Sequence, residues 1–161
     1  MRLFYLLVLV LFLMDLSAQN SHSIGFQFSQ KQESMENMSL RYEYMISKNN
    51  GIKSQLGWSL FHDFRSYHFK LGYQRQLVQY KKLSIWSGLD YEYEHLDFAI
   101  LDQDNDRKLT FSIPLEINWR LNDKIDLFSG ISVPVNIHSA KGYNYSEYNT
   151  MDFRIGITKR L

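Results

Sequence analysis

The 161-residue sequence contains no cysteine and only two prolines, and its formal net charge is +1. Without cysteine the chain cannot form disulfides, thiolate metal sites or a lipid-modified cysteine anchor. A net charge this close to zero gives no reason to expect nucleic acid or another polyanion as a partner. Beyond its N-terminal segment the sequence also lacks any extended helical periodicity, so the absences favour an all-β protein.

The N-terminal segment contains the one long apolar run. Arg2 precedes an apolar stretch over residues 3–14, and the small residues Ser17 and Ala18 follow it. This layout is typical of a secretory signal peptide, and the run is shorter than the ~20 residues of a membrane-spanning helix. We therefore predict a signal peptide over residues 1–19 and one mature domain over residues 20–161. An N-terminal membrane anchor is the alternative.

The rest of the chain consists of segments in which apolar and polar residues alternate. The clearest is LTFSIPLEINWRL (109–121), with bulky apolar side chains at every odd position. This two-residue period predicts a β-strand with two unlike faces. Several segments have the ~9–11 residues of a tilted strand that crosses a membrane. The eight segments cover residues 23–29, 38–47, 52–61, 66–74, 83–94, 108–121, 125–138 and 151–161.

The links between these segments fall into two classes. Eight up-and-down strands would place the short links at one end, with both termini, and the longer loops at the other end. The short links, rich in turn residues or lysine, are 47–51, 76–82 and 121–124. The longer ones are 30–38, 95–108 and 139–150, and the link around residues 62–65 on the same side is shorter than these.

Two barrel architectures share this alternation and differ in which face lies inside. A soluble lipocalin-like barrel is apolar inside, whereas a transmembrane barrel turns its apolar face to lipid. Here the apolar face carries more aromatic rings than a narrow interior could hold. The polar face carries glycines, which leave room for large side chains opposite them. We therefore predict an eight-stranded antiparallel up-and-down transmembrane β-barrel. The glycines are Gly25, Gly57, Gly72, Gly88, Gly130 and Gly156.

Charges of both signs occur on the polar face in nearly equal numbers. This balance suits an ion-pair network inside the barrel, because unpaired buried charges are costly. Tyrosine and tryptophan of the apolar face should lie near the two membrane interfaces. The residues predicted for the interior network are Arg41, Glu43, Lys70, Asp90, Glu92, Glu116, Arg120 and Arg154. Those predicted at the interfaces are Tyr67, Tyr91 and Tyr93 near the longer loops, and Tyr73 and Trp119 near the short links.

Pro114 and Pro134 lie inside two neighbouring segments, on the polar parity and at similar height. Proline cannot donate to a β-ladder, and a closed barrel offers no edge to accommodate it. One interpretation is a pair of bulges or positions outside the hydrogen-bonded pairs. The other is a lateral seam in the wall through which a lipid chain passes sideways.

The signal-like segment, the eight alternating segments, the unequal links and the final stretch MDFRIGITKRL (151–161) resemble small outer-membrane β-barrels of Gram-negative bacteria of the OmpX/OmpA-barrel type. The resemblance implies an outer-membrane location and contact with membrane lipid and lipopolysaccharide. We expect a monomer with a side-chain-filled interior and a structural or interaction role at the cell surface. A protein or glycan partner would contact the loops at 95–108 and 139–150. Those families typically end on an aromatic residue, whereas this chain ends on Leu161.

Two other classes of function are weighed against this role. One is a lipid-modifying barrel enzyme, similar to a lipid A acyltransferase or deacylase; the other is a periplasmic lipocalin-like binding protein. The deacylases use a His/Ser pair separated by one residue, whereas His138 and Ser139 are adjacent and point to opposite sides of a strand. The stretch DQDND (102–106) continues with Arg107 where a calcium loop needs glycine. We therefore expect no catalytic residues, cofactor or metal site.

Overall fold

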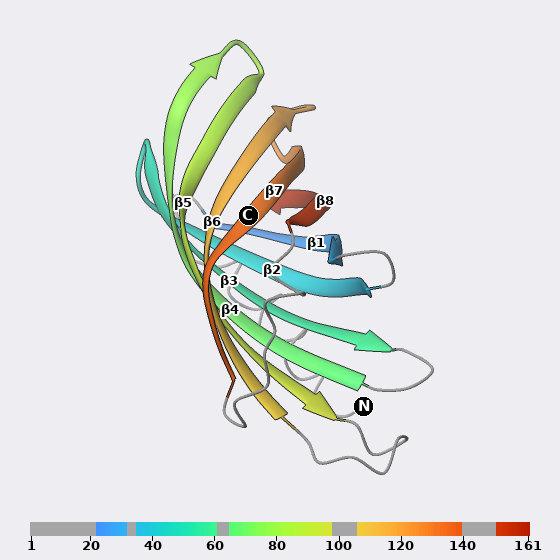
Figure 1. Ribbon diagram of the computed structural model, residues 1–161. Helices are drawn as coiled ribbons and strands as arrows, with labels where there is room; N and C mark the ends of the chain where they lie inside the picture. The colour runs from blue at the N-terminus through green and yellow to red at the C-terminus, as the bar shows by residue number, and fades with distance from the viewer. Residues whose placement is uncertain (1–21, 32–34, 61–64, 98–105, 140–150) are drawn as a thin grey trace.

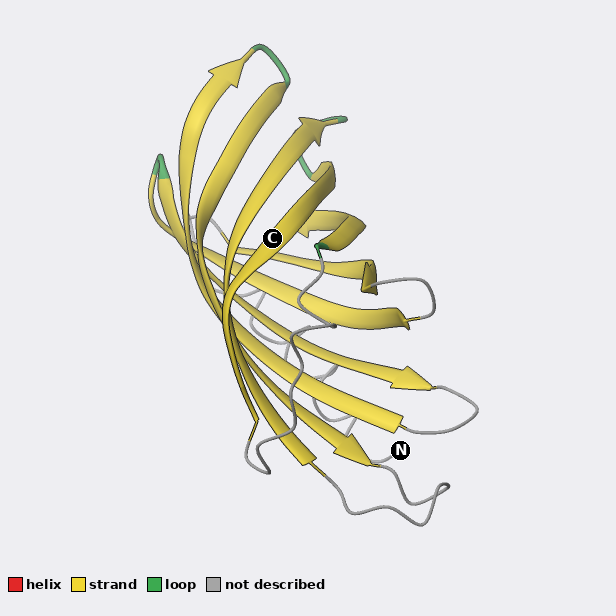
Figure 2. Cartoon of the chain, viewed as in Figure 1, coloured by secondary structure: helices red, strands yellow, loops and turns green. Residues whose placement is uncertain are grey.

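The computed structural model describes residues 22–31, 35–60, 65–97, 106–139 and 151–161, which form one closed antiparallel β-barrel (Figures 1 and 2). Each strand pairs with the next one in the chain, and the last returns to the first, which confirms the predicted fold class. No helix in these ranges is long and apolar enough to cross a membrane. The strands are β1 (His22–Lys31), β2 (Met35–Ser47), β3 (Asn50–Leu60), β4 (Arg65–Tyr80), β5 (Leu83–Asp97), β6 (Asp106–Arg120), β7 (Ile125–Ser139) and β8 (Asp152–Arg160).

Pairing between the first and last strands closes the barrel. Phe26 of β1 lies opposite Ile157 of β8, and the backbone N–H of Leu161 donates to the carbonyl of His22 at 2.9 Å. Every described strand therefore has a hydrogen-bonded neighbour on both sides. A sheet without a free edge is what hydrocarbon requires of a membrane-spanning β-structure, because lipid cannot satisfy backbone N–H and C=O groups.

The two ends of the barrel carry different connections. Turns at 48–49, 81–82 and 121–124 join successive strands at one end, where β1 also begins and β8 ends; we call this the short-turn end (Figure 2). The opposite end is called the long-loop end, and its connections at 32–34, 61–64, 98–105 and 140–150 lie outside the described residues.

Strand β6 shows which face lies inside. Phe111 and Ile117 are 52% and 51% exposed, whereas Glu116 between them in the strand register is 1% exposed. The apolar face of residues 109–121 therefore points away from the barrel axis and the polar face points into the lumen. The same pattern holds in β4, where exposed and buried residues alternate from Arg65 to Arg75.

Strand β4 is longer than the sequence pattern predicts. The residues expected to form a link at 76–82 mostly belong to the strand, which pairs with β5 as far as Tyr80 and Leu83. A bulge between Gln76 and Val78 breaks the alternation, and this explains why periodicity stopped at residue 74. The turn that follows places Lys81 in the left-handed region, with φ of 51°, as a tight hairpin turn demands.

A second bulge shifts the alternation of β7. Ser112 of β6 pairs with Pro134, but Phe111 pairs with Asn136, so Val135 is the extra residue on β7. Beyond it, Asn136 is exposed and Ile137 lies opposite Thr110, which is buried in the lumen. The single parity predicted for residues 125–138 therefore holds only as far as the bulge.

Gly156 leaves the space that a large interior side chain occupies. A Cβ atom at this position would overlap the carbonyl oxygen of Phe26 and the ring of Phe128. We expect Gly156→Val to lower the free energy of unfolding by about 1–3 kcal/mol through overpacking, measured by urea titration of the detergent-folded protein. Ser129→Val adds similar bulk on the exposed face beside Phe128, so it should have little effect. Equal losses in both variants would contradict this packing.

Candidate functional site

One carboxylate at the centre of the lumen contacts three cations from three other strands. Glu116 of β6 lies 2.6 Å from the Arg41 guanidinium of β2, 2.9 Å from Lys53 Nζ of β3 and 3.3 Å from the Arg154 guanidinium of β8. All four side chains are at most 2% exposed. Glu116 therefore joins strands on opposite sides of the barrel through charge-assisted contacts.

Asp90 of β5 extends this cluster on the side of the long-loop end. Its two carboxylate oxygens lie 3.1 Å from Lys53 Nζ and 3.0 Å from Arg154 Nη1. Arg154 also donates from Nε to Asp152 at 3.0 Å. Two cations are thus shared among three carboxylates, and each charge has at least one ion-pair partner without access to water.

The ion pairs continue toward the long-loop end. Lys70 Nζ lies 3.0 Å from Glu92 and 3.6 Å from Asp152. Lys108 Nζ lies 2.8 Å from Glu94. These side chains are at most 9% exposed, so a nearly continuous set of paired charges occupies the lumen from the centre of the barrel outward.

On the other side of Glu116, Arg41 is held by both charge and an aromatic ring. Its Nε donates to Glu43 at 2.7 Å, a second guanidinium nitrogen also contacts Glu43, and the guanidinium carbon lies 4.2 Å from the ring centroid of Phe128. Phe128 is 3% exposed, in the space beside Gly156. The cation–π contact fixes Arg41, which is completely buried.

The structure places all but one of the predicted network residues in this cluster. Arg41, Glu43, Lys70, Asp90, Glu92, Glu116 and Arg154 are buried in the lumen. Arg120 is not: its side chain is 44% exposed, and it lies at the short-turn end, 3.8 Å from Asp126. It is the last residue of β6, where the lumen opens. Lys53, Lys108 and Asp152, which lie on the same polar parity, also belong to the network.

Two large apolar side chains also point inward, against the alternation rule. Trp86 and Leu96 of β5 are 7% and 3% exposed. Both occupy positions that alternate with the outward-facing residues of β5, so their place in the strand puts them in the lumen. Their hydrophobic character alone would have placed them on the outer face. Trp86 donates from its indole nitrogen to Ser84 Oγ at 2.8 Å, so its polar atom is satisfied within the barrel.

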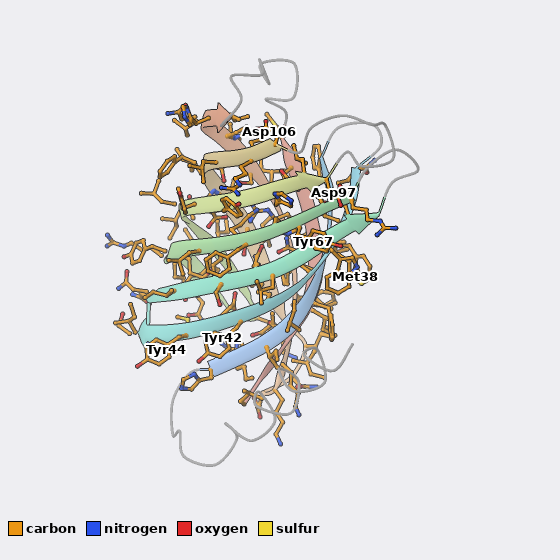
Figure 3. The ribbon with its side chains drawn as sticks, turned by 90° about the horizontal axis from the view of Figure 1, so that it is seen from below. Met38, Tyr42, Tyr44, Tyr67, Asp97 and Asp106 are labelled. Carbon is orange, nitrogen blue, oxygen red and sulfur yellow. The ribbon has the colours of Figure 1, made fainter. Side chains whose placement is uncertain are left out.

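The predicted interface aromatics mostly lie on the outer face. Tyr67, Tyr73, Tyr91 and Trp119 are exposed, and Tyr93 is half-buried. Figure 3 shows Tyr67 near one end of the barrel and Tyr42 and Tyr44 near the other.

The prediction did not include a cluster around Tyr42 at the short-turn end. The Tyr42 hydroxyl is 2.6 Å from His22 Nδ1, and the His22 and Tyr44 rings are 5.0 Å apart. Amphipathic rings of this kind suit a membrane–water boundary.

The two prolines lie where strand pairing is irregular. The β5–β6 ladder runs as far as Ser87 opposite Leu115 and resumes at Asp90 opposite Ser112. The residues in between are Gly88 and Leu89, which face Pro114 and Ile113. The Ser87 hydroxyl donates to the Pro114 carbonyl at 2.7 Å, and Pro134 adjoins the β7 bulge. Both prolines therefore coincide with breaks in regular hydrogen bonding.

The described part of the interior is occupied mainly by paired charges. Across the described ranges, no group of three or more His, Asp or Glu side chains could hold a metal ion. The candidate calcium loop falls largely outside those ranges, as does the Ser139 side chain beside His138.

Comparisons with known proteins identify the class of the barrel. The fold is that of small eight-stranded transmembrane β-barrels. The chain is similar to the N-terminal β-barrel domain of Pseudomonas aeruginosa OprF, with a TM-score of 0.64, 8% identity and coverage of 89% of this chain and 98% of that one. It is also similar to Neisserial surface protein A (0.54, 9%, 87% and 94%) and to the designed barrel TMB2.3 (0.61, 12%, 89% and 98%). At these identities the likeness concerns the fold.

A family model places the chain more narrowly. Residues 19–161 match the family described as "Protein of unknown function, DUF481", and the chain belongs to this family. The narrower resemblance to OmpX-like proteins is not confirmed, whereas the broader likeness to small outer-membrane barrels is supported by the solved structures. A search of curated proteins finds no match.

Removing the charge of Glu116 should lower the free energy of unfolding more than removing any other charge of the barrel. Replacing it with glutamine leaves Arg41, Lys53 and Arg154 short of one shared partner in a dry lumen. We expect Glu116→Gln to lower the free energy of unfolding by about 3–5 kcal/mol. Asp126→Asn at the open short-turn end should cost under about 1 kcal/mol, because that ion pair is partly in water. Urea titrations in detergent compare the two, and a larger loss for Asp126→Asn would refute this ranking.

The break at Pro114 should be visible in amide hydrogen exchange. Gly88 lies outside the regular β5–β6 ladder, so its amide should exchange at least about tenfold faster than those of Trp86 and Asp90. Pro114→Ala restores a backbone donor opposite Gly88 and should slow the exchange at this residue. Uniform protection along β5 in the unmodified protein would show that the proline does not weaken the wall.

Proposed function

We propose that this protein is an outer-membrane β-barrel with a closed interior that has a structural or interaction role at the cell surface. The observation that carries the proposal is the inverted polarity of the barrel: charged side chains are buried in the lumen and large apolar side chains cover the outside. In water such a surface would promote aggregation, because exposed apolar patches of this extent are found at membrane or protein contacts.

The outer face supports contact with lipid on all sides of the barrel. Exposed apolar residues occur on every strand, for example Phe28 on β1, Leu71 on β4 and Ile155 on β8, with exposed fractions between 47% and 63%. The proposed partners of this surface are outer-membrane lipid and lipopolysaccharide. Export would use the predicted signal peptide over residues 1–19, which lies outside the described residues.

The contents of the lumen argue against conduction through a wide pore. Fully buried ion pairs around Glu116 occupy the centre of the barrel, and an eight-stranded barrel is just wide enough for side chains to fill. Specific contact would then fall to the long-loop end. The proposed surface partner, a protein or a glycan, would contact the loops at 95–108 and 139–150, of which residues 98–105 and 140–150 lie outside the described ranges.

Of the other two classes, the lipid-modifying enzyme keeps one supporting observation. The ladder gap opposite Pro114 and the bulge beside Pro134 form a locally weakened wall, which is where a lipid chain would enter sideways. A lipocalin-like binder has less support, because such proteins need an apolar internal cavity, whereas ion pairs occupy the centre of this lumen.

Cell fractionation and electrophoresis test the membrane assignment. We expect the protein to partition with the detergent-extracted outer membrane and to migrate faster on unheated gels than after boiling, because a closed barrel resists unfolding by detergent. In planar bilayers the folded protein should give no large, steady conductance. Recovery in the soluble periplasmic fraction would refute the proposal. Palmitate transfer to purified lipid A, or acyl release from it, would assign the enzyme class instead.

A further inference from the structure

A cavity of about 720 Å³ opens at the short-turn end and is not explained by the role proposed above. Residues of the β2–β3 and β4–β5 hairpins form its walls, and the β4–β5 hairpin extends well beyond the neighbouring turns (Figure 1). At its inner end lie Glu43 and Gln74, which contact the fully buried Arg41. The cavity, called the basin below, therefore ends at the ion-paired layer. Its volume is in the range of small-molecule sites, roughly 300–1,000 Å³.

Positive charge predominates around the basin. Five of its lining residues are lysine or arginine and two are acidic. The two acids are already engaged: Glu43 accepts from Arg41 and from Ser23 Oγ at 2.7 Å, and Asp126 accepts two hydrogen bonds from Arg160, at 2.6 and 2.9 Å. The five cations are Lys48, Lys81, Lys82, Arg120 and Arg160.

Arg120 and Lys82 make only long polar contacts with the described residues around the basin. Arg120 Nε lies 3.8 Å from Asp126 Oδ1, an ion pair beyond hydrogen-bond distance, and Arg160 donates to the other oxygen of that carboxylate. Lys82 Nζ reaches the Leu121 carbonyl at 3.4 Å, which is a neutral acceptor. An anionic group entering the basin would therefore gain charge-assisted hydrogen bonds that the described residues do not already make.

Two residues that line the basin each hold one buried acceptor without a hydrogen-bond donor. Asn118 Oδ1 and Asp126 Oδ1 have no hydrogen-bond partner among the described residues. Both residues lie beside Arg120, since Asn118 precedes it by two residues on β6 and Asp126 lies opposite it on β7. Buried acceptors left unpaired are costly, so turning either side chain toward a hydroxyl group of a ligand in the basin would relieve this cost.

We infer that the basin binds an acidic glycan, a sugar chain that carries carboxylates. A carboxylate of the glycan would accept hydrogen bonds from Arg120 and Lys82, and its sugar hydroxyls would donate to Asn118 and Asp126. A simple inorganic anion offers charge with little hydrogen-bond donation, and a neutral sugar offers donors without charge. The binding site is inferred from the geometry of the basin itself. That the short-turn end, and with it the basin, faces the periplasm rests on the proposed function.

Calorimetric titration of the detergent-folded protein at low ionic strength tests this inference. The probe is an oligogalacturonate, with a neutral malto-oligosaccharide of equal length and inorganic phosphate as comparisons. We expect the oligogalacturonate to bind and the other two to bind far more weakly. In a variant with Trp58 and Trp119 replaced by phenylalanine, binding should also change the fluorescence of Trp86, which lines the basin.

Substitutions separate the basin from general surface charge. Combining Lys82→Gln with Arg120→Gln should raise the Kd by about tenfold or more. Asn118→Ala should weaken the oligogalacturonate and leave the weak binding of phosphate unchanged. Lys159→Gln is the matched control, because Lys159 is an exposed lysine at the same end that does not line the basin, and it should keep the original Kd. A heat-shifted gel band verifies that each variant is folded.

Three outcomes would overturn the inference. They are no oligogalacturonate binding by folded protein, equal affinity for phosphate or the neutral oligosaccharide, and equal weakening by Lys159→Gln. None of these outcomes bears on whether the barrel is membrane-integral, so failure here is distinguishable from failure of the proposed function.

Discussion

The structure depends on neutralising charge inside a space from which water is nearly excluded. An eight-stranded barrel has a lumen that side chains fill, and this chain fills it with carboxylates, lysines and arginines instead of hydrocarbon. Glu116 is central to this arrangement, because it pairs with Arg41, Lys53 and Arg154 from three other strands at once. With the polar side chains paired inside, the apolar side chains are free to cover the outside, and inner glycines such as Gly156 provide room for the largest interior groups.

Sequence periodicity captures most of the architecture but fails where the backbone breaks the period. Residues 109–121 alternate without interruption, and both their strand and their inside face could be predicted. At Val135 one extra residue reverses the parity of the remainder of β7, and at residues 76–78 a bulge hides the last part of β4. Pro134 marks the β7 bulge in the sequence, as one interpretation of the prolines expected, whereas the β4 bulge has no such marker. The prediction that Arg120 belongs to the interior network was wrong for a related reason. Parity indicates the side of the sheet to which a side chain points, but it does not indicate where along the strand the lumen ends.

The similarity to a designed barrel at 12% identity shows how little of this sequence the fold itself requires. Alternation, turn residues and closure are enough to define an eight-stranded barrel. The particular chemistry of the chain must then lie where these rules leave freedom, which is in the lumen and at the two ends. At the short-turn end, the excess of lysine and arginine around an open cavity is such a feature, because neither the wall nor the ion-paired layer needs those charges there.

Arg154 belongs to the last strand, and this position has a consequence for how the barrel assembles. The guanidinium reaches across the lumen to Asp90 and Glu116, and Asp152 on the same strand accepts from it. A chain whose first seven strands have associated still leaves Asp90 with Lys53 as its one cation within the described network. Docking of β8 then adds Arg154, the cation that Asp90 and Glu116 share, at the same moment as it removes the two open sheet edges. Completion of the ion-pair network and backbone closure are thus a single event, and a translation product truncated before β8 would leave Asp90 and Glu116 without this shared partner.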